Sequence, residues 1–163
     1  MFDQNRAALE SAVAMFNEPA RRERYLDLYA PDVVLHGYPR GVSGASGVRD
    51  FYSRLWTAFP DARLELEDML GSEDRLAVRY TLSGVQTDAF YGAPTAAPEG
   101  QELRVEGIAW LRFEKGRVVE VWQASATLDT ITRLSARAAL APTRTSASAE
   151  AAALRWEERH GGD

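Results

Sequence analysis

His36 and Glu120 are the side chains of this sequence whose types and positions best suit proton transfer. His36 ends the apolar run VVLH just before a glycine-rich segment, and an imidazole with an ordinary pKa of about 6.5 suits a general base at neutral pH. Glu120 lies in the run VVEVWQASA, which is typical of a strand. Each also has a structural alternative, because His36 could be a hydrogen-bonded strand end and Glu120 could pair with Arg112 or Arg104.

Several other chemistries are disfavoured by what the chain lacks. It contains no cysteine, which removes disulfide bonds, thiolate zinc sites and a cysteine nucleophile. Its second histidine, His160, lies far from His36 in the sequence, so no ligand-spaced pair predicts a metal site, and we assign His160 no chemistry. The formal net charge of -5 argues against nucleic acid as a partner, because binding to it needs clustered lysine and arginine.

The length and composition are typical of one globular domain. The 163 residues are 45% hydrophobic, which is enough to bury one sizeable core. No apolar run is long enough for a signal-peptide core or for the roughly 20 residues of a membrane span. We therefore expect a soluble cytoplasmic protein that does not bind a membrane.

The order of the predicted elements favours an α+β fold. Apolar residues at helical spacing predict helices over residues 3–18, 20–29 and 46–59, and the third is the most amphipathic. After Pro60 the spacing becomes strand-like. Strands are predicted over residues 33–38, 63–70, 75–84, 101–114 and 117–126, with a hairpin turn at residues 114–117. Helices followed by a meander predict helices that cover one face of an antiparallel sheet.

Two segments stand apart from this core. Residues 86–100 form a long connection rich in alanine and proline, and loops of that length are usually lids, binding loops or disordered. Its aromatic residues, Phe90 and Tyr91, are candidate lid residues. Past Leu134 the chain becomes rich in serine and alanine. We therefore predict a domain over residues 1–134 and an appended tail over residues 135–163, with a candidate short helix around residues 149–160.

The chain resembles the SnoaL-like polyketide cyclases and related ester cyclases in four segments, which are YLDLYAPDVVLHG, FPDARLELEDML, DRLAVRYTLSGVQTDAFYGAPT and GIAWLRFEKGRVVEVW. The resemblance covers about residues 22–134. It implies the cone-shaped α+β fold shared with ketosteroid isomerase and the nuclear transport factor family. In that fold three N-terminal helices pack on a strongly curved antiparallel sheet and form an apolar, cone-shaped pocket. The resemblance further implies a cofactor-free enzyme that closes rings in polyketide intermediates, and a homodimer paired through the open sheet face.

The resemblance also identifies a departure at Ala126. In family members that cyclise polyketides, an acidic residue follows the last-strand tryptophan, here Trp122, four positions later and moves the proton, but this chain has Ala126 there. Strand parity puts Glu120, Trp122, Ala124 and Ala126 on one face of the sheet, which could be a roomy cavity wall. Glu120 and His36, at a place where the family often has histidine, are the predicted catalytic substitutes.

Other residues are candidates for substrate contacts. Aromatic residues on the helices should mostly be core, but one or two phenols could reach the pocket as oxyanion donors. Arg79 could polarise a carbonyl group or pair with Glu65 or Glu67. Trp110 and Arg112 share a strand face, as stacked neighbours or as pocket residues. The predicted substrate-binding set is Trp122, Tyr25, Tyr29, Trp56, Arg79, Phe90, Tyr91, Trp110, Arg112 and Ala126.

Three functional hypotheses follow. The first is cyclisation of a polyketide-like substrate. In one version His36 or Glu120 is the substitute base. In the other the pocket folds the substrate for a pericyclic or conjugate closure, and such orientation can lower the barrier of an intramolecular reaction by about 7–11 kcal/mol. The second is isomerisation or epoxide hydrolysis on the same fold, which ordinarily needs a well-placed carboxylate. The third is a non-catalytic small-molecule-binding domain. Losses of about 10²-fold in turnover at His36 and Glu120 would indicate proton transfer, whereas a larger loss at Trp122 would indicate a pocket that works by shape.

Overall fold

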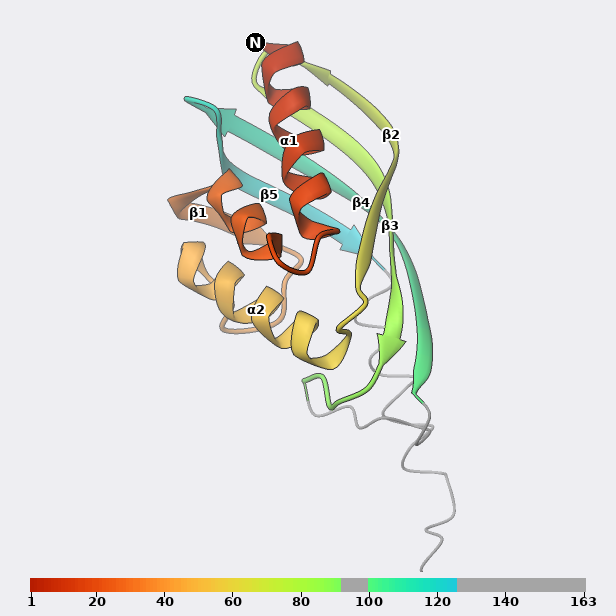
Figure 1. The fold of residues 1–163 in the computed structure, drawn as a ribbon. Coiled ribbons are helices and arrows are strands. Elements are labelled where there is room, and N and C mark those ends of the chain that lie inside the picture. The colour runs from red at the N-terminus through yellow and green to blue at the C-terminus, as the bar shows by residue number, and fades with distance from the viewer. Residues whose placement is uncertain (92–99, 126–163) are drawn as a thin grey trace, which may run out of the picture.

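The computed structural model describes residues 1–91 and 100–125, and Figure 1 shows the fold. In chain order the elements are helix α1 (Phe2–Phe16), the 3-10 helix η1 (Arg22–Leu28), strand β1 (Tyr29–His36), helix α2 (Gly44–Ala58), and strands β2 (Arg63–Ser72), β3 (Arg75–Gln86), β4 (Gln101–Glu114) and β5 (Arg117–Ser125). The chain is therefore an α+β protein. The expected helix over residues 20–29 is a 3-10 helix, a form common in short connectors. The predicted tail over residues 135–163 lies outside the described residues.

The five strands form one curved, open sheet in the order β1-β5-β4-β3-β2 (Figure 1). Strands β2 to β5 make the predicted antiparallel meander, whereas β1 pairs with β5 in parallel. The sheet is therefore mixed, and the expectation of a wholly antiparallel sheet was wrong. Alternation of side chains along a strand determines which residues share a face, but it does not encode the direction in which an edge strand joins its neighbour.

The helices lie on one side of this sheet (Figure 1). α1 contacts β2 and β3, and α2 contacts β1. The predicted helical spacing is confirmed, because the buried side chains on α1 include Leu9, Val13 and Phe16, and those on α2 include Val48, Phe51, Tyr52 and Leu55. No helix within the described residues is long and apolar enough to cross a membrane. The face of the sheet opposite the helices is called the outer face below.

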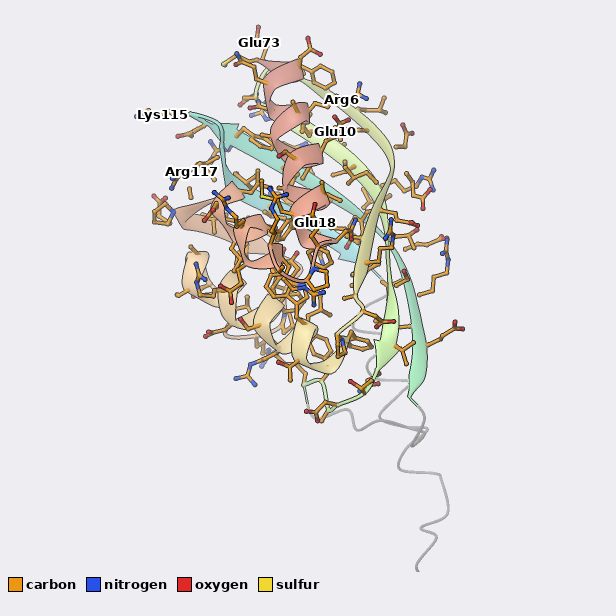
Figure 2. The ribbon with its side chains drawn as sticks, in the orientation of Figure 1. Arg6, Glu10, Glu18, Glu73, Lys115 and Arg117 are labelled. Atoms are coloured by element: carbon orange, nitrogen blue, oxygen red, sulfur yellow. The ribbon has the colours of Figure 1, made fainter. Side chains whose placement is uncertain are left out.

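The exposed side of α1 and its C-terminal end have different roles. Arg6 and Glu10 form an ion pair of 2.8 Å on the exposed side (Figure 2), where such pairs stabilise a protein only weakly. At the other end, the amide of Asn17 accepts from the backbone nitrogen of Leu64 and donates to its carbonyl oxygen, both at 2.8 Å. Asn17 thus pairs with β2 as a neighbouring strand would, and fixes the end of α1 against the sheet.

The predicted hairpin between β4 and β5 is confirmed by its backbone. Lys115 and Gly116 have φ angles of 51° and 76°, and two consecutive positive values are what a type I′ turn requires. Lys115 and Arg117 lie at this tip of the sheet in Figure 2. The turn sets the antiparallel register in which Trp110 lies opposite Trp122, and this register determines the contacts of the outer face.

Candidate active site

A cavity of about 70 Å³ lies between the sheet and the helices, and it is the candidate active site. Its wall is mostly leucine, valine and phenylalanine from α1, α2 and strands β2 to β5. None of the described residues that line it carries a charge. Its polar groups are the phenols of Tyr25, Tyr29, Tyr38, Tyr52 and Tyr80 and the amide side chain of Gln123.

Three of these phenols meet at one point of the wall. The hydroxyl oxygen of Tyr25 lies 2.8 Å from that of Tyr29 and 3.3 Å from that of Tyr52. Tyr25 belongs to η1, Tyr29 begins β1 and Tyr52 lies on α2, so three separate elements build the cluster. The two contacts use two of the three hydroxyl hydrogens, and the third is available to Tyr38 or to a ligand oxygen.

Aromatic packing holds this tyrosine cluster (Tyr25, Tyr29 and Tyr52) in place. Phe16, which is fully buried, meets the rings of Tyr25 and Tyr52 edge-on, with centroids 5.2 Å and 5.9 Å away. Tyr25 also meets the ring of Tyr29 edge-on at 5.7 Å. Each edge-to-face pair adds about 0.5–1.5 kcal/mol of stabilisation beyond that of the buried area. Rotating a ring so that its hydroxyl group leaves the cluster would lose this stabilisation.

Burial keeps the tyrosine cluster protonated. Desolvation is the largest cause that raises the pKa values of Tyr25, Tyr29 and Tyr52 above the ordinary tyrosine value, because a buried phenolate loses its hydration. The pKa of Tyr38 is raised well above that value for the same reason. At neutral pH these groups are therefore hydrogen-bond donors, and they are not bases.

The last strand closes the cavity with the side of β5 that carries Val121 and Gln123. Gly37, just after β1, packs against this strand so closely that a Cβ atom there would lie 1.8 Å from the carbonyl oxygen of Gln123. The amide of Gln123 is the one group other than a phenol that the described wall offers for hydrogen bonding to a ligand. It can donate and accept.

Of the predicted site residues, Tyr25 and Tyr29 line the cavity, but His36, Glu120 and Trp122 do not. The predicted parity of Glu120 and Trp122 is confirmed by the register of β5. The expectation that their face forms the cavity wall is corrected, because Val121 and Gln123 line the cavity instead. Helices can cover either face of a sheet, and parity alone does not say which. Arg79, Trp110 and Arg112 share the outer face with Glu120 and Trp122.

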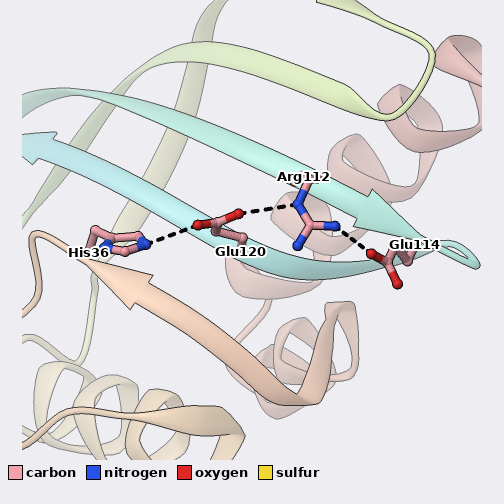
Figure 3. A network of polar contacts seen from close by, with 4 residues as sticks. All are labelled: His36, Arg112, Glu114 and Glu120. Carbon is pink, nitrogen blue, oxygen red and sulfur yellow. Dashed lines mark hydrogen bonds and ion pairs between the residues drawn. The ribbon is translucent and has the colours of Figure 1, made fainter.

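On the outer face the structure joins His36, Glu120, Arg112 and Glu114 in one polar network (Figure 3). His36 Nε2 lies 3.1 Å from Glu120 Oε1, and Arg112 Nε donates to Glu120 Oε2 at 3.2 Å. Arg112 also pairs with Glu114. The hydrogen bond from His36, and after it the bond from Arg112, lowers the pKa of Glu120. The expected structural alternative, a pair between Glu120 and Arg112, is therefore confirmed.

The imidazole of His36 also stacks on the indole of Trp122, with centroids 3.7 Å apart and planes 15° from parallel. An ionised carboxylate only accepts hydrogen bonds, so the contact with Glu120 puts the hydrogen of His36 on Nε2. The imidazole is thus oriented by two neighbours, as a functional histidine often is. The catalytic roles of His36 and Glu120 stay predictions, with the pair placed outside the cavity.

The remaining candidates are core residues or lie at the surface. Trp56 and Phe90 are buried outside the lining of the cavity, and Phe90 meets Phe51 and Phe59 edge-on. Tyr91 is 41% exposed. Ala126, where the resemblance predicts an acidic residue, lies outside the described residues. Among the described residues, no group of three or more His, Asp or Glu side chains could hold a metal ion.

Sequence reasoning missed Tyr38 and Gln123 as lining residues. The expectation that one or two phenols from the helices could reach the pocket covers Tyr52 on α2, but its contact with Tyr25 depends on packing. For Gln123 a signal was present, because it shares its strand face with Val119 and Val121. An apolar strand face that carries one amide fits a cavity wall better than the opposite face, which carries a carboxylate.

The chain matches a family model and many solved structures. The model of the SnoaL-like polyketide cyclases matches residues 7–134. AclR of Streptomyces galilaeus, described as a candidate hydroxylase, is 26% identical with a TM-score of 0.67, over 82% of this chain and 97% of AclR. A candidate SnoaL-like polyketide cyclase from Jannaschia sp. CCS1 is 22% identical with a TM-score of 0.66, over 82% of this chain and 93% of that one.

TsrD of Streptomyces laurentii is a third similar structure, 25% identical with a TM-score of 0.65, over 79% of this chain and 96% of TsrD. A search of curated proteins gives no significant match. The family match spans most of the chain, including the elements that enclose the tyrosine-lined cavity. The chain therefore belongs to the SnoaL-like polyketide cyclase family.

Proposed function

We propose that this protein is a cofactor-independent cyclase that closes a ring in a neutral, polyketide-like substrate bound in the cavity. The observation that carries the proposal is the tyrosine cluster inside a wall whose described residues bear no charge. Apolar walls with a few convergent polar groups are typical of small-molecule sites. The family to which the chain belongs supports the substrate class.

The phenols suit the charge that develops during ring closure. In an aldol or conjugate closure, negative charge gathers on a carbonyl oxygen as the new carbon–carbon bond forms. Tyr25, with Tyr29 and Tyr52 hydrogen-bonded to it, can donate to that oxygen. Donors preorganised in a dry site stabilise such an oxyanion strongly, and the loss of one typically costs about 10²–10³-fold in rate.

The described wall offers no base, so the substrate has to supply its own nucleophile as an enol. A carbon between two carbonyl groups is partly enolised. As the enol carbon bonds to the acceptor carbon, the π bond of the acceptor breaks, and the enol hydroxyl proton passes to the oxygen on which the negative charge gathers. Residue 126, where the resemblance predicts an acid, is alanine. We therefore favour closure by substrate folding and oxyanion stabilisation over proton transfer by His36 or Glu120. Epoxide hydrolysis fits less well, because it ordinarily needs a carboxylate and a positioned water.

The volume of the cavity sets a condition on this proposal. The cavity holds about 70 Å³, whereas drug-sized ligands occupy pockets of about 300–1,000 Å³. Substrate binding therefore has to widen the cavity. The less completely buried apolar and aromatic residues of its wall are Tyr38, Leu64, Leu66, Tyr80 and Leu82. We therefore expect the wall to move there, while the tyrosine cluster stays fixed by its packing.

The direct test is conversion of linear and partly cyclised β-polyketone esters, followed by chromatography with mass detection. Saturable formation of a ring-closed product, lost in Tyr25→Phe, is the expected result. Saturable binding without any conversion would replace the proposal with a ligand-binding domain.

A second candidate is hydroxylation, which the likeness to AclR favours. It would be recognised by a product that has gained an oxygen atom.

We also propose that the outer face pairs with a second copy of the chain. The strand pairing places five residues in a row across the outer face, which are His36, Trp122, Trp110, Ala77 and Leu70. Trp122 is 52% exposed and Ile108, in the next row, is 58% exposed. Neighbouring exposed apolar side chains of this size often mark an interface.

Charges on either side of these apolar rows complement each other. Along β4 the residues that point to the outer face are, in order, Glu106, Ile108, Trp110 and Arg112. Arg75 lies opposite Arg112, so the arginine row and the Glu106 row flank the two apolar rows. A two-fold axis between the rows of Trp110 and Ile108 would place Arg75 of one copy near Glu106 of the other. Self-complementarity of this kind is what a symmetric dimer requires.

A further inference from the structure

A second hollow, separate from the cavity, lies between the η1 segment and α2. It has a volume of about 560 Å³ and shares no lining residue with the cavity. Three arginines and one glutamate line it, in a chain whose formal net charge is -5. Its lining residues are Pro19, Ala20, Arg21, Arg22, Glu23, Arg24, Ser53, Trp56 and Thr57. The hollow is polar and positive, unlike the cavity.

Arg22 is the unusual member of this group because it is buried. Its exposed fraction is 9%, and no carboxylate among the described residues lies within ion-pair distance of it. Nη2 donates to the carbonyl oxygen of Pro60 at 3.0 Å, but Nε has no hydrogen-bond partner. The guanidinium lies over the indole of Trp56, 5.7 Å from its centroid. A buried cation without a counter-ion is costly.

Trp56 adds a second donor without an acceptor. It too is 9% exposed, and its indole Nε1 is buried with no hydrogen-bond partner. Buried indole N–H groups usually find an acceptor. Two nine-tenths-buried residues on facing elements of one hollow therefore each carry an N–H group without an acceptor. A hydrogen-bond acceptor would suit both N–H groups, and beside a guanidinium a negatively charged acceptor fits best.

We propose that this hollow binds an oxyanion, the phosphate or carboxylate group of a small ligand, with Arg22 and Trp56 as its principal donors. A guanidinium matches two oxygens of such a group at once. Arg24, which has no ion pair among the described residues, and Ser53 add a charge and a hydroxyl at the rim. Arg21 contributes less, because it pairs with Glu18 at 3.2 Å.

The test is an NMR titration of the full chain with inorganic phosphate and, separately, with acetate, against sodium chloride at matched ionic strength. The indole N–H resonance of Trp56, assigned by its loss in Trp56→Phe, reports on the hollow. We expect a saturable shift with at least one of the two oxyanions. The anion that saturates at the lower concentration identifies the class of ligand. Equal, non-saturating shifts with all three salts would overturn the proposal.

Two variants separate a specific site from general attraction. Arg22→Gln should weaken oxyanion binding by about tenfold or more, since hydrogen bonds to charged groups are the strong ones. Arg6→Gln removes one positive charge from the exposed side of α1, outside the hollow, and is the control. It should change the affinity by about twofold or less. If Arg22→Gln does not fold, Trp56→Phe followed by backbone resonances of Ser53 and Thr57 serves instead and should also weaken binding. Unchanged affinity in the folded Arg22 or Trp56 variant would contradict the proposal.

Discussion

The hydroxyl oxygens of Tyr25 and Tyr29 lie 2.8 Å apart within a cavity whose described lining carries no charge. Tyr25 also contacts Tyr52 and so forms the centre of the tyrosine cluster. Burial raises the pKa values of all three, which makes them donors at neutral pH. Such a site can stabilise negative charge on a substrate oxygen, but it cannot remove a proton as a carboxylate would.

Replacing the central phenol should lower turnover more than stability. Tyr25→Phe removes the hydroxyl that joins the other two, and we expect kcat to fall by about 10²-fold. The free energy of unfolding should change by about 1–3 kcal/mol, the usual cost of lost buried hydrogen bonds. Steady-state kinetics and urea unfolding measure the two effects. Tyr91→Phe, at an exposed ring outside the cavity, is the control, and wild-type turnover in Tyr25→Phe would remove the cluster from the mechanism.

Alkaline pH should destabilise the fold through the tyrosine cluster. The folded-state pKa values are raised, so above the ordinary value of about 10 the unfolded chain loses protons that the folded chain keeps. The stabilisation is fully present below that pH. Above it, each phenol lowers the free energy of unfolding by up to about 1.4 kcal/mol per pH unit. Urea unfolding between about pH 8 and about pH 11 measures this slope, and Tyr52→Phe should reduce it. An identical slope in the variant would contradict the assignment.

Variants of the outer-face pair should leave the chemical step intact. His36→Ala and Glu120→Gln remove groups that lie outside the lining of the cavity, so we expect kcat to stay within about threefold of wild type. The same assay used for Tyr25→Phe provides the comparison. A loss of about 10²-fold in both variants would instead support the proton-transfer role predicted from sequence.

Exchange of two charges should test the proposed homodimer. Arg75→Glu and Glu106→Arg should each weaken the dimer, because each places like charges together across the proposed two-fold axis. The double exchange should restore it. Size-exclusion chromatography with light scattering gives the molar mass of the wild type and of the three variants. A monomeric wild type, or a double variant no tighter than the single ones, would argue against this pairing.

Alanine substitutions at two glycines can separate the stability cost of a steric clash from that of an unfavourable backbone conformation. Gly37 and Gly41 both have positive φ angles, 82° and 87°. A Cβ atom at Gly37 would meet the backbone of Gln123, whereas one at Gly41 would meet nothing within 4 Å. We expect Gly41→Ala to cost about 1–2 kcal/mol, and Gly37→Ala to cost more than about 4 kcal/mol by forcing β1 away from β5. Thermal unfolding measures both, and equal costs would show that the contact is easily relieved.

The sequence by itself determined the local structure and the family. Apolar spacing predicted the two α-helices, alternation predicted the strands, and Lys115-Gly116 predicted the tight turn. Alternation also predicted that Glu120 and Trp122 share a face, since successive side chains on a strand must point to opposite sides. These features depend on neighbours in the chain, which a sequence shows directly.

Only the tertiary structure decided which face of the sheet the helices cover, and with it the site. Parity is the same whichever face is buried, so it could not distinguish the wall of Val121 and Gln123 from the outer face of Glu120 and Trp122. Nor could it show that Tyr25 meets Tyr52, because that contact joins two residues 27 positions apart on different elements. Long-range packing makes such contacts, and it also set the parallel direction of β1 at the sheet edge.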